Sequence, residues 1–288
     1  MSDLIYCPYT DSEIDPALTN NEHIVPLSLG GSNSFVLPVN KKFNSDAGSD
    51  IDGVLANDLL VLFRRQQFDA RGHSKKEPTI RSKHSTMDSG SRPVQVEFSG
   101  EEGLRIYDPV QKRTLKENEV TGKEFRSSFT ISRFGRLKFA AKVALAGGYF
   151  VFGNWFRQNV NHKELRALMN FDRNSKKSDF ENFELKVIDE FTHPEEKDVE
   201  YLAVEKLFCQ IIKGSCIYFV PGPVNIGITV GVLGQLVATL NVPANTDEFP
   251  FSDENDLGHV VILEDGELKR MSYRNLLIKA YEHLDQKS

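Results

Sequence analysis

A carboxylate and an imidazole stand side by side near the start of the chain, at Glu22 and His23. A carboxamide follows at Asn40, directly after an apolar run that ends at Val39. Carboxylate and amide oxygens suit a hard cation such as Mg²⁺, and an imidazole can act as a base near neutral pH. These residue types predict a divalent-cation site with a base beside it, provided that the fold brings them together.

The segment between these residues has the pattern of a β-hairpin that leads into a helix. One short apolar run ends at Pro26, another begins at Phe35, and the Gly30–Gly31 pair between them is a turn signal. A helix is expected to open near Asn40. Such a hairpin could place the carboxylate, the imidazole and the carboxamide at one end.

Residues 7 to about 65 resemble the HNH endonucleases, whose catalytic unit is a ββα-metal hairpin. The order Glu-His-Ile-Val-Pro, a double glycine, Asn33 and then Asn-Lys-Lys is similar to HNH proteins that read EHIIP…LGG…CNNKFG…ID. The resemblance implies that His23 activates water and that Glu22 and Asn40 hold one divalent cation, Mg²⁺ or Mn²⁺. It also implies that Asn33 pins the hairpin loop.

Asn44 is an alternative to Asn40 as the amide ligand. It comes one helical turn later, so its side chain could face the same way. The spacing of the family signature favours Asn40.

The resemblance has one departure. Family members often carry two Cys-x-x-Cys pairs around the hairpin that hold a structural zinc, and the corresponding positions here read Cys7, Thr10, Val36 and Val39. A single thiolate cannot form a tetrahedral sulfur site. We therefore expect no structural zinc, with the two valines packed in its place.

The chain has 288 residues and a formal net charge of -6, which argues against a protein that binds nucleic acid over its whole surface. Basic residues gather in 64–92 and 123–142, whereas 247–267 has acidic residues and no Lys or Arg. This segregation predicts one phosphate-facing side. The candidate contacts with nucleic acid, expected to be double-stranded DNA, are Lys41, Lys42, Arg64, Arg65, Lys75 and Lys76.

The length predicts an α+β protein of two modest parts. Residues 1–71 are expected to form the HNH-like ββα-metal nuclease domain. The polar and basic segment 72–93 is expected to be a linker. Residues 94–288 are expected to form a mixed α+β accessory domain with an antiparallel sheet, which binds DNA or regulates access to the nuclease.

Two helices are predicted from periodicity and caps. Ser49, with Asp52 three residues later, resembles a capping box that opens a helix running to about Phe68. Another helix is expected over 132–145, stopped by Gly147–Gly148.

Residues 214–246 contain no charged residue, so a membrane span must be considered. Prolines, glycines and Gln235 interrupt this stretch, and its pieces have the length of strands. We therefore expect sheet strands here, a hairpin through Asp265–Gly266 and a last helix capped by Ser272. The expected strands are Cys216–Val220, Ile226–Val232 and Leu236–Leu240.

The three cysteines are too few and too scattered for a disulfide framework, which predicts a reducing compartment. The first residues, MSDLIYCPYT, lack the pattern of a signal peptide. We therefore expect a cytoplasmic protein without a membrane anchor.

The sequence thus predicts a metal-dependent endonuclease that hydrolyses phosphodiester bonds of DNA. One alternative is a non-catalytic nucleic-acid-binding protein on a decayed HNH scaffold, which the missing cysteines favour. Another is a nuclease effector that is switched on when a ligand or protein partner binds the C-terminal part.

Overall fold

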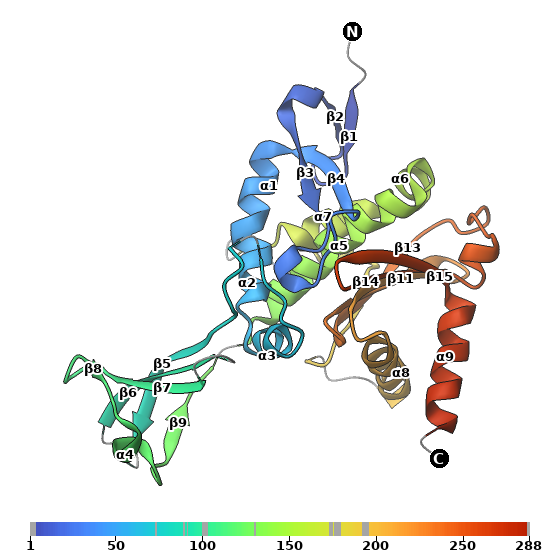
Figure 1. The fold of residues 1–288 in the computed structure, drawn as a ribbon. Coiled ribbons are helices and arrows are strands. Elements are labelled where there is room, and N and C mark those ends of the chain that lie inside the picture. The colour runs from blue at the N-terminus through green and yellow to red at the C-terminus, as the bar shows by residue number, and fades with distance from the viewer. Residues whose placement is uncertain are drawn as a thin grey trace.

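The computed structural model describes residues 4–72, 74–88, 90, 92–99, 103–129, 131–172, 175, 180–191 and 196–286. These residues form an α+β fold in which the paired strands are antiparallel. Figure 1 shows an N-terminal hairpin above a long central helix, a C-terminal sheet beside that helix, and a smaller sheet that projects away from both.

The N-terminal part consists of two small hairpins and a run of short helices. Its strands are β1 (Ile5–Cys7) paired with β2 (Ser12–Ile14) and β3 (Thr19–His23) paired with β4 (Val36–Asn40). The helices are α1 (Lys41–Ala47), a π-helical turn Gly48–Asp52, α2 (Gly53–Ala56) and α3 (Leu59–Gln67). The predicted hairpin that leads into a helix is therefore present.

The single helix predicted from a capping box at Ser49 is wrong. The chain is already helical from Lys41, so Ser49 lies inside a helical run, where its backbone needs no N-cap. The cap falls instead at Asp58, whose carboxylate accepts the N–H of Leu60 at 3.1 Å and opens α3.

Part of the predicted linker forms a strand of the smaller sheet. Residues 80–87 are β5, although residues 73, 89 and 91 of the predicted linker lie outside the described residues. The sheet runs β8-β7-β6-β5-β9 and has its own core around Met87, Val94 and Ile106. Its other elements are β6 (Arg92–Ser99), β7 (Gly103–Asp108), β8 (Arg113–Thr114), α4 (Glu117–Val120) and β9 (Phe125–Ser127).

The central helix α5 (Arg133–Phe152) is longer than predicted, because it continues through Gly147–Gly148. The two glycines allow close packing there: a Cβ would lie 2.9 Å from Ile217 at the first and 2.2 Å from Phe156 at the second. They therefore serve the packing of the helix and do not end it. Two shorter helices, α6 (Asn154–Asn159) and α7 (His162–Met169), follow.

The C-terminal sheet runs β10-β13-β12-β11-β14-β15, with α5 on one face and two further helices on the other. Apolar cores lie on both faces, which explains the absence of charge in residues 214–246. The predicted strands, the hairpin at Asp265–Gly266 and the Ser272 cap are confirmed. The elements are β10 (Lys186–Ile188), α8 (Glu196–Ile212), β11 (Ser215–Pro221), β12 (Asn225–Val232), β13 (Gln235–Pro243), β14 (His259–Glu264), β15 (Glu267–Ser272) and α9 (Tyr273–Asp285). Among the described helices, none has the length and apolar character to cross a membrane.

One core joins the N-terminal hairpin to the C-terminal sheet. It extends from Cys7 to Leu263 and includes Phe35 of the hairpin loop and much of α5. Ser215 at the start of β11 donates a hydrogen bond to the carbonyl of Leu29 at 2.5 Å. The predicted boundary between residues 1–71 and 94–288 therefore does not separate two cores. The packing across α5 joins residues that are far apart in the chain, so the sequence carries no local sign of it.

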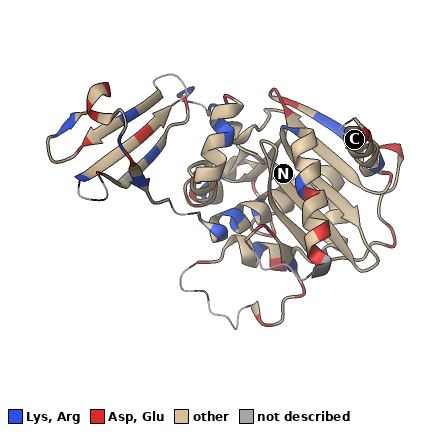
Figure 2. Cartoon of the chain, turned by 90° about the horizontal axis from the view of Figure 1, so that it is seen from below, with Lys and Arg blue, Asp and Glu red and all other residues tan. Residues whose placement is uncertain are grey.

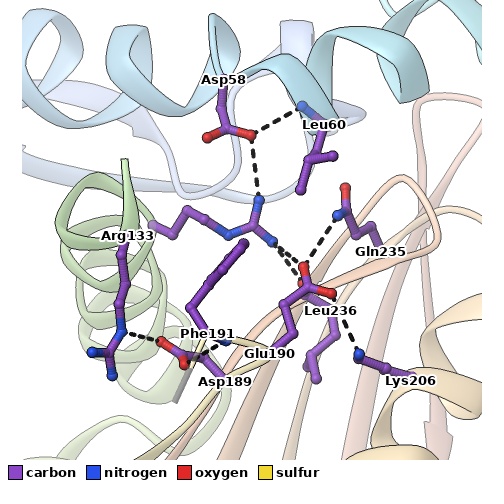
Figure 3. A network of polar contacts seen from close by, with 10 residues as sticks. Asp58, Leu60, Arg133, Asp189, Glu190, Phe191, Lys206, Gln235 and Leu236 are labelled. Carbon is purple, nitrogen blue, oxygen red and sulfur yellow. Dashed lines mark hydrogen bonds and ion pairs between the residues drawn. The ribbon is translucent and has the colours of Figure 1, made fainter. Parts of the chain in front are cut away.

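Arg136 on α5 lies in the interior and connects three parts of the chain. Its side chain is 1% exposed and contacts Asp58 at 3.5 Å and Glu190 at 3.3 Å. It also donates to the carbonyl of Leu236 on β13 at 2.9 Å, and its guanidinium lies 5.3 Å from the ring centroid of Phe191 (Figure 3). The helix is thereby tied to the cap of α3 and to the C-terminal sheet.

We predict that Arg136→Met lowers the free energy of unfolding by about 3–5 kcal/mol, because it leaves the buried carboxylate of Asp58 without its cation. Chemical denaturation monitored by circular dichroism measures the change. Arg81→Ala is the control, because its ion pair with Glu97 is largely exposed, and it should change stability little. Equal stability of Arg136→Met and wild type would show that the network is not structural.

A candidate active-site cleft on the hairpin

Strands β3 and β4 pair so that Glu22 lies opposite Leu37 and His23 opposite Val36, at the end of the hairpin that leads into the loop. The loop turns at Gly30, whose φ of 76° favours glycine. A Cβ at Gly31 would lie 1.8 Å from the carbonyl oxygen of Val25, so no side chain fits there. The double glycine therefore closes the loop behind the Glu-His pair.

His23 is oriented by Asn33, as a hydrogen bond of 2.9 Å joins its Nε2 to Oδ1 of Asn33. Because Oδ1 can only accept, Nε2 carries the proton in this arrangement. A neutral imidazole of that tautomer has its lone pair on Nδ1, the nitrogen that can take a proton from water. The structure thus brings together His23, the predicted base, and Asn33, which was predicted to pin the hairpin loop.

Asn40 lies elsewhere. It stands opposite Thr19, three register positions from Glu22, which is roughly 10 Å along the strand. Its Oδ1 accepts the N–H groups of Lys42 and Phe43 at 3.0 and 3.2 Å and so caps α1. The geometry therefore assigns Asn40 the role of a helix cap.

A cleft of about 310 Å³ opens beside His23, between the hairpin and the helices that follow it. Asn44 lines it, one turn into α1, and its Nδ2 donates to Asn20 at 3.0 Å. Asn44, and not Asn40, is therefore the asparagine that lines this cleft together with Glu22 and His23. We call this space the hairpin cleft; its lining residues are Asn21, Glu22, His23, Pro26, Leu27, Ser28, Asn44, Asp52 and Gly72.

Glu22 and Asp52 share one cation, the ammonium group of Lys142 on α5. Lys142 is 0% exposed, forms an ion pair with Glu22, and lies 2.7 and 2.9 Å from the two carboxylate oxygens of Asp52. Burial tends to lower the pKa of Lys142, but Asp52 and Glu22 together raise it above its ordinary value. The lysine is therefore held in its charged form.

The two carboxylates outnumber the ammonium. Burial raises the pKa of Asp52 to about 6, and the negative charge of Glu22 acts in the same direction, while Lys142 opposes both. The cluster therefore keeps a surplus negative charge and a tendency to bind a further cation or a proton.

Sequence reasoning missed Asp52 and Lys142 as site residues. Asp52 was assigned to a capping box, and Lys142 to an exposed basic run together with Arg136, which is also buried. A signal was nevertheless present, because Lys142 interrupts the apolar stretch FAAKVALA, residues 139–146. A lysine inside a helix that is apolar on all sides must be buried and needs a carboxylate partner.

The residues predicted to contact nucleic acid do not form one surface. Lys75 and Lys76 are exposed and follow Gly72, which lies at the rim of the hairpin cleft, but Lys76 lines a second pocket together with Arg65. Lys42 is exposed on α1. Lys41, also exposed on α1, donates to the carbonyl of Ala17 at 2.9 Å. The remaining candidates are not at the rim: Arg64 bonds Gln67 at 2.9 Å, and the partly buried Arg65 bonds the carbonyl of Ala56 at 2.8 Å.

The expected segregation of charge is also weaker than predicted. On the smaller sheet, blue and red segments alternate in Figure 2. Several of its cations are paired with carboxylates, which are in order Arg81 with Glu97, Arg92 with Asp108, Arg113 with Glu119 and Lys123 with Asp88. The smaller sheet therefore does not present the uniformly basic surface that the sequence predicted.

The hairpin cleft offers a different set of candidate oxygen ligands from the pair predicted from sequence. Glu22, Asp52 and Asn44 supply hard oxygen atoms at one place, and the ammonium of Lys142 shows that the two carboxylates already hold a cation together. Among the described residues, no group of three or more His, Cys, Asp and Glu forms a metal cluster. A third oxygen ligand beside Glu22 and Asp52 would therefore have to be an amide, that of Asn44.

The positions that hold zinc in many HNH proteins are filled differently here. Cys7 and Val39 are fully buried in the core, and the backbone N–H of Asn40 points to the sulfur of Cys7 at 3.5 Å. Val36 is partly buried, and Thr10 is exposed and bonds Ser12 at 2.8 Å. Apolar packing thus supports the base of the hairpin.

No protein-family model, no curated protein and no solved structure matches the chain significantly. The functional argument therefore depends on the residues and geometry of the hairpin cleft.

We predict that Asn44→Ala weakens Mn²⁺ binding at least about tenfold while it leaves stability nearly unchanged, because its side chain is partly exposed and lines the cleft. Asn40→Ala is the matched control. It should lower the free energy of unfolding by about 0.5–2 kcal/mol through loss of the cap and leave Mn²⁺ affinity unchanged. Calorimetric titration and thermal unfolding measure the two effects, and the reverse pattern would restore Asn40 as the ligand.

A second prediction concerns pH. Because the pKa of Asp52 is about 6 in the folded state and 3.8 as its ordinary value, folding favours the protonated form. The stabilisation of wild type relative to Asp52→Asn should therefore be largest below pH 4, fall by up to roughly 3 kcal/mol as the pH rises to 6, and then level off. Denaturant titrations at several pH values test this, and a difference that increases with pH would contradict it.

Proposed function

We propose that this protein is a metal-dependent endonuclease that hydrolyses phosphodiester bonds of DNA in the hairpin cleft. The observation that carries the proposal is that Glu22 and an Asn33-oriented His23 line one open cleft at the end of a ββα hairpin. The resemblance to the HNH endonucleases implies the same roles for Glu22 and His23, but it implies Asn40 as the amide ligand where we propose Asn44.

His23 acts as the general base. Its hydrogen bond to Asn33 fixes the ring, and its position at the cleft lets it take a proton from a water molecule beside the scissile phosphate. Proton transfer by a positioned side chain of this kind contributes typically about 10²–10⁴-fold to a rate.

Glu22, Asp52 and Asn44 would hold the divalent cation, Mg²⁺ or Mn²⁺. When bound, such an ion stabilises negative charge on the phosphate and on the leaving oxygen. The chain's own contribution is to hold the three oxygen donors on the hairpin, on the π-helical turn and on α1, close to the base. Preorganised donors of this kind lower the cost of reaching the transition state.

Lys75 and Lys76, together with Lys42 on α1, are placed to contact the DNA backbone. All three are exposed; Lys42 is on α1, which also carries Asn44 of the hairpin cleft, and Lys75 and Lys76 follow Gly72 of the cleft lining by three and four residues. Such contacts carry no sequence information and make binding depend on salt.

A second candidate function is a nucleic-acid-binding protein that no longer cuts. The observation in its favour is the ion pair of Lys142 with Glu22 and Asp52, because these carboxylates then already have a cation. The open cleft and the oriented His23 favour the enzyme.

The decisive experiment is plasmid cleavage with Mg²⁺ or Mn²⁺. We predict that wild type cuts and that His23→Ala lowers the rate by about 10²–10⁴-fold without loss of DNA binding, because the base is removed and the lysines remain. His283→Ala is the matched control, because His283 lies on α9, far along the chain from the hairpin, and it should cut like wild type. Tight binding by wild type without any cleavage would instead support the non-catalytic function.

A further inference from the structure

Helix α9 exposes a row of large apolar side chains, which we call the α9 stripe. Leu277, Tyr281 and Leu284 are 39%, 73% and 51% exposed, and their spacing of four and three residues places them on one face of the helix. Ile278, which is 49% exposed, borders that face and completes the stripe. The solvated face of a surface helix is ordinarily polar, so the stripe indicates a surface that another molecule covers.

Helix α9 is held to the rest of the chain by a different face. Leu276 and Ala280 are buried in the core between the C-terminal sheet and its outer helices, and Tyr273 packs against that core. The ring of Tyr273 also contacts Phe208 of α8, with the ring centroids 5.8 Å apart. The α9 stripe adjoins this buried face, so the apolar part of α9 is wider than the part that packs against the sheet.

Opposite charges stand at the two ends of the α9 stripe. Arg274 comes seven residues before Tyr281 and Asp285 comes four residues after it, so both lie in line with the stripe. Both side chains are exposed. Arg274 pairs with Asp256 at the surface, but a guanidinium group has five N–H donors and can serve a second carboxylate.

We propose that the α9 stripe joins two copies of this chain in a symmetric dimer in which the two α9 helices run antiparallel. A two-fold axis that places Arg274 of one copy beside Asp285 of the second also places Ile278 beside Tyr281, because both pairs are centred on the same point of the helix. Each contact then occurs twice. A parallel pair would instead place like charges together, which is unfavourable.

The dimer would leave the hairpin cleft open in both copies. Helix α9 lies on the face of the C-terminal sheet opposite α5, and the cleft is formed by the hairpin and helices on the α5 side (Figure 1). One assembly would therefore present two clefts. The inference is independent of the proposed function, because self-association through α9 needs neither metal nor DNA.

Sedimentation velocity at protein concentrations between about 1 and 100 μM tests the dimer. Wild type should sediment as a dimer whose fraction increases with concentration. Tyr281→Glu should raise the dissociation constant at least about a hundredfold, because two charges enter the centre of the interface. Val110→Glu is the matched control: Val110 is also 73% exposed, but it lies in the turn between β7 and β8, so this variant should dimerise like wild type.

A charge exchange tests the antiparallel arrangement. Arg274→Glu and Asp285→Arg should each weaken the dimer, because each places like charges opposite one another at both ends of the interface. The double variant restores opposite charges and should recover most of the lost affinity. Loss of the exposed pair between Arg274 and Asp256 should change the stability of the chain little, which thermal unfolding measures.

A wild type that stays monomeric over the whole range would overturn self-pairing and would make a different protein the partner of the α9 stripe. A dimer that persists in Tyr281→Glu would place the interface elsewhere. A double variant that binds no more tightly than the single variants would overturn the antiparallel arrangement. None of these results bears on the nuclease, which plasmid cleavage tests separately.

Discussion

Two positive charges buried on one helix constrain the whole arrangement. Lys142 and Arg136 lie six residues apart on α5, and neither is exposed by more than 1%. A buried cation needs anionic partners, and those partners come from other parts of the chain: Glu22 and Asp52 for the lysine, and Asp58 for the arginine. Helix α5 can therefore occupy only the position at which these carboxylates converge.

The rigidity of the hairpin cleft follows from this position. Phe35 in the hairpin loop is fully buried in the core that α5 shares, and the loop carbonyl of Leu29 is bonded to Ser215 of the C-terminal sheet. The side chains of the cleft thus project from backbone that is fixed on two sides. A site on such a support keeps its geometry without a bound ligand.

Local sequence patterns predicted most turns and strands but not the pairs of residues that contact each other across the chain. The turn at Gly30–Gly31, the strands between 216 and 240 and the Ser272 cap are determined by neighbours in sequence, and the structure contains them. The pairing of Lys142 with Asp52 spans 90 positions, so no window of sequence contains both residues. Strand β5 was missed for another reason: its residues are mostly polar, and two of the residues that it buries are serines, Ser82 and Ser85.

The topology of the smaller sheet is that of a unit inserted into a longer chain. Its first strand β5 and its last strand β9 are direct neighbours, with Met87 opposite Phe125, so the chain enters and leaves at one edge. Because it also has its own apolar interior, this unit resembles a cassette inserted between α3 and α5. Descendants of this protein could therefore exchange the cassette for another module without repacking the helix and hairpin that surround His23.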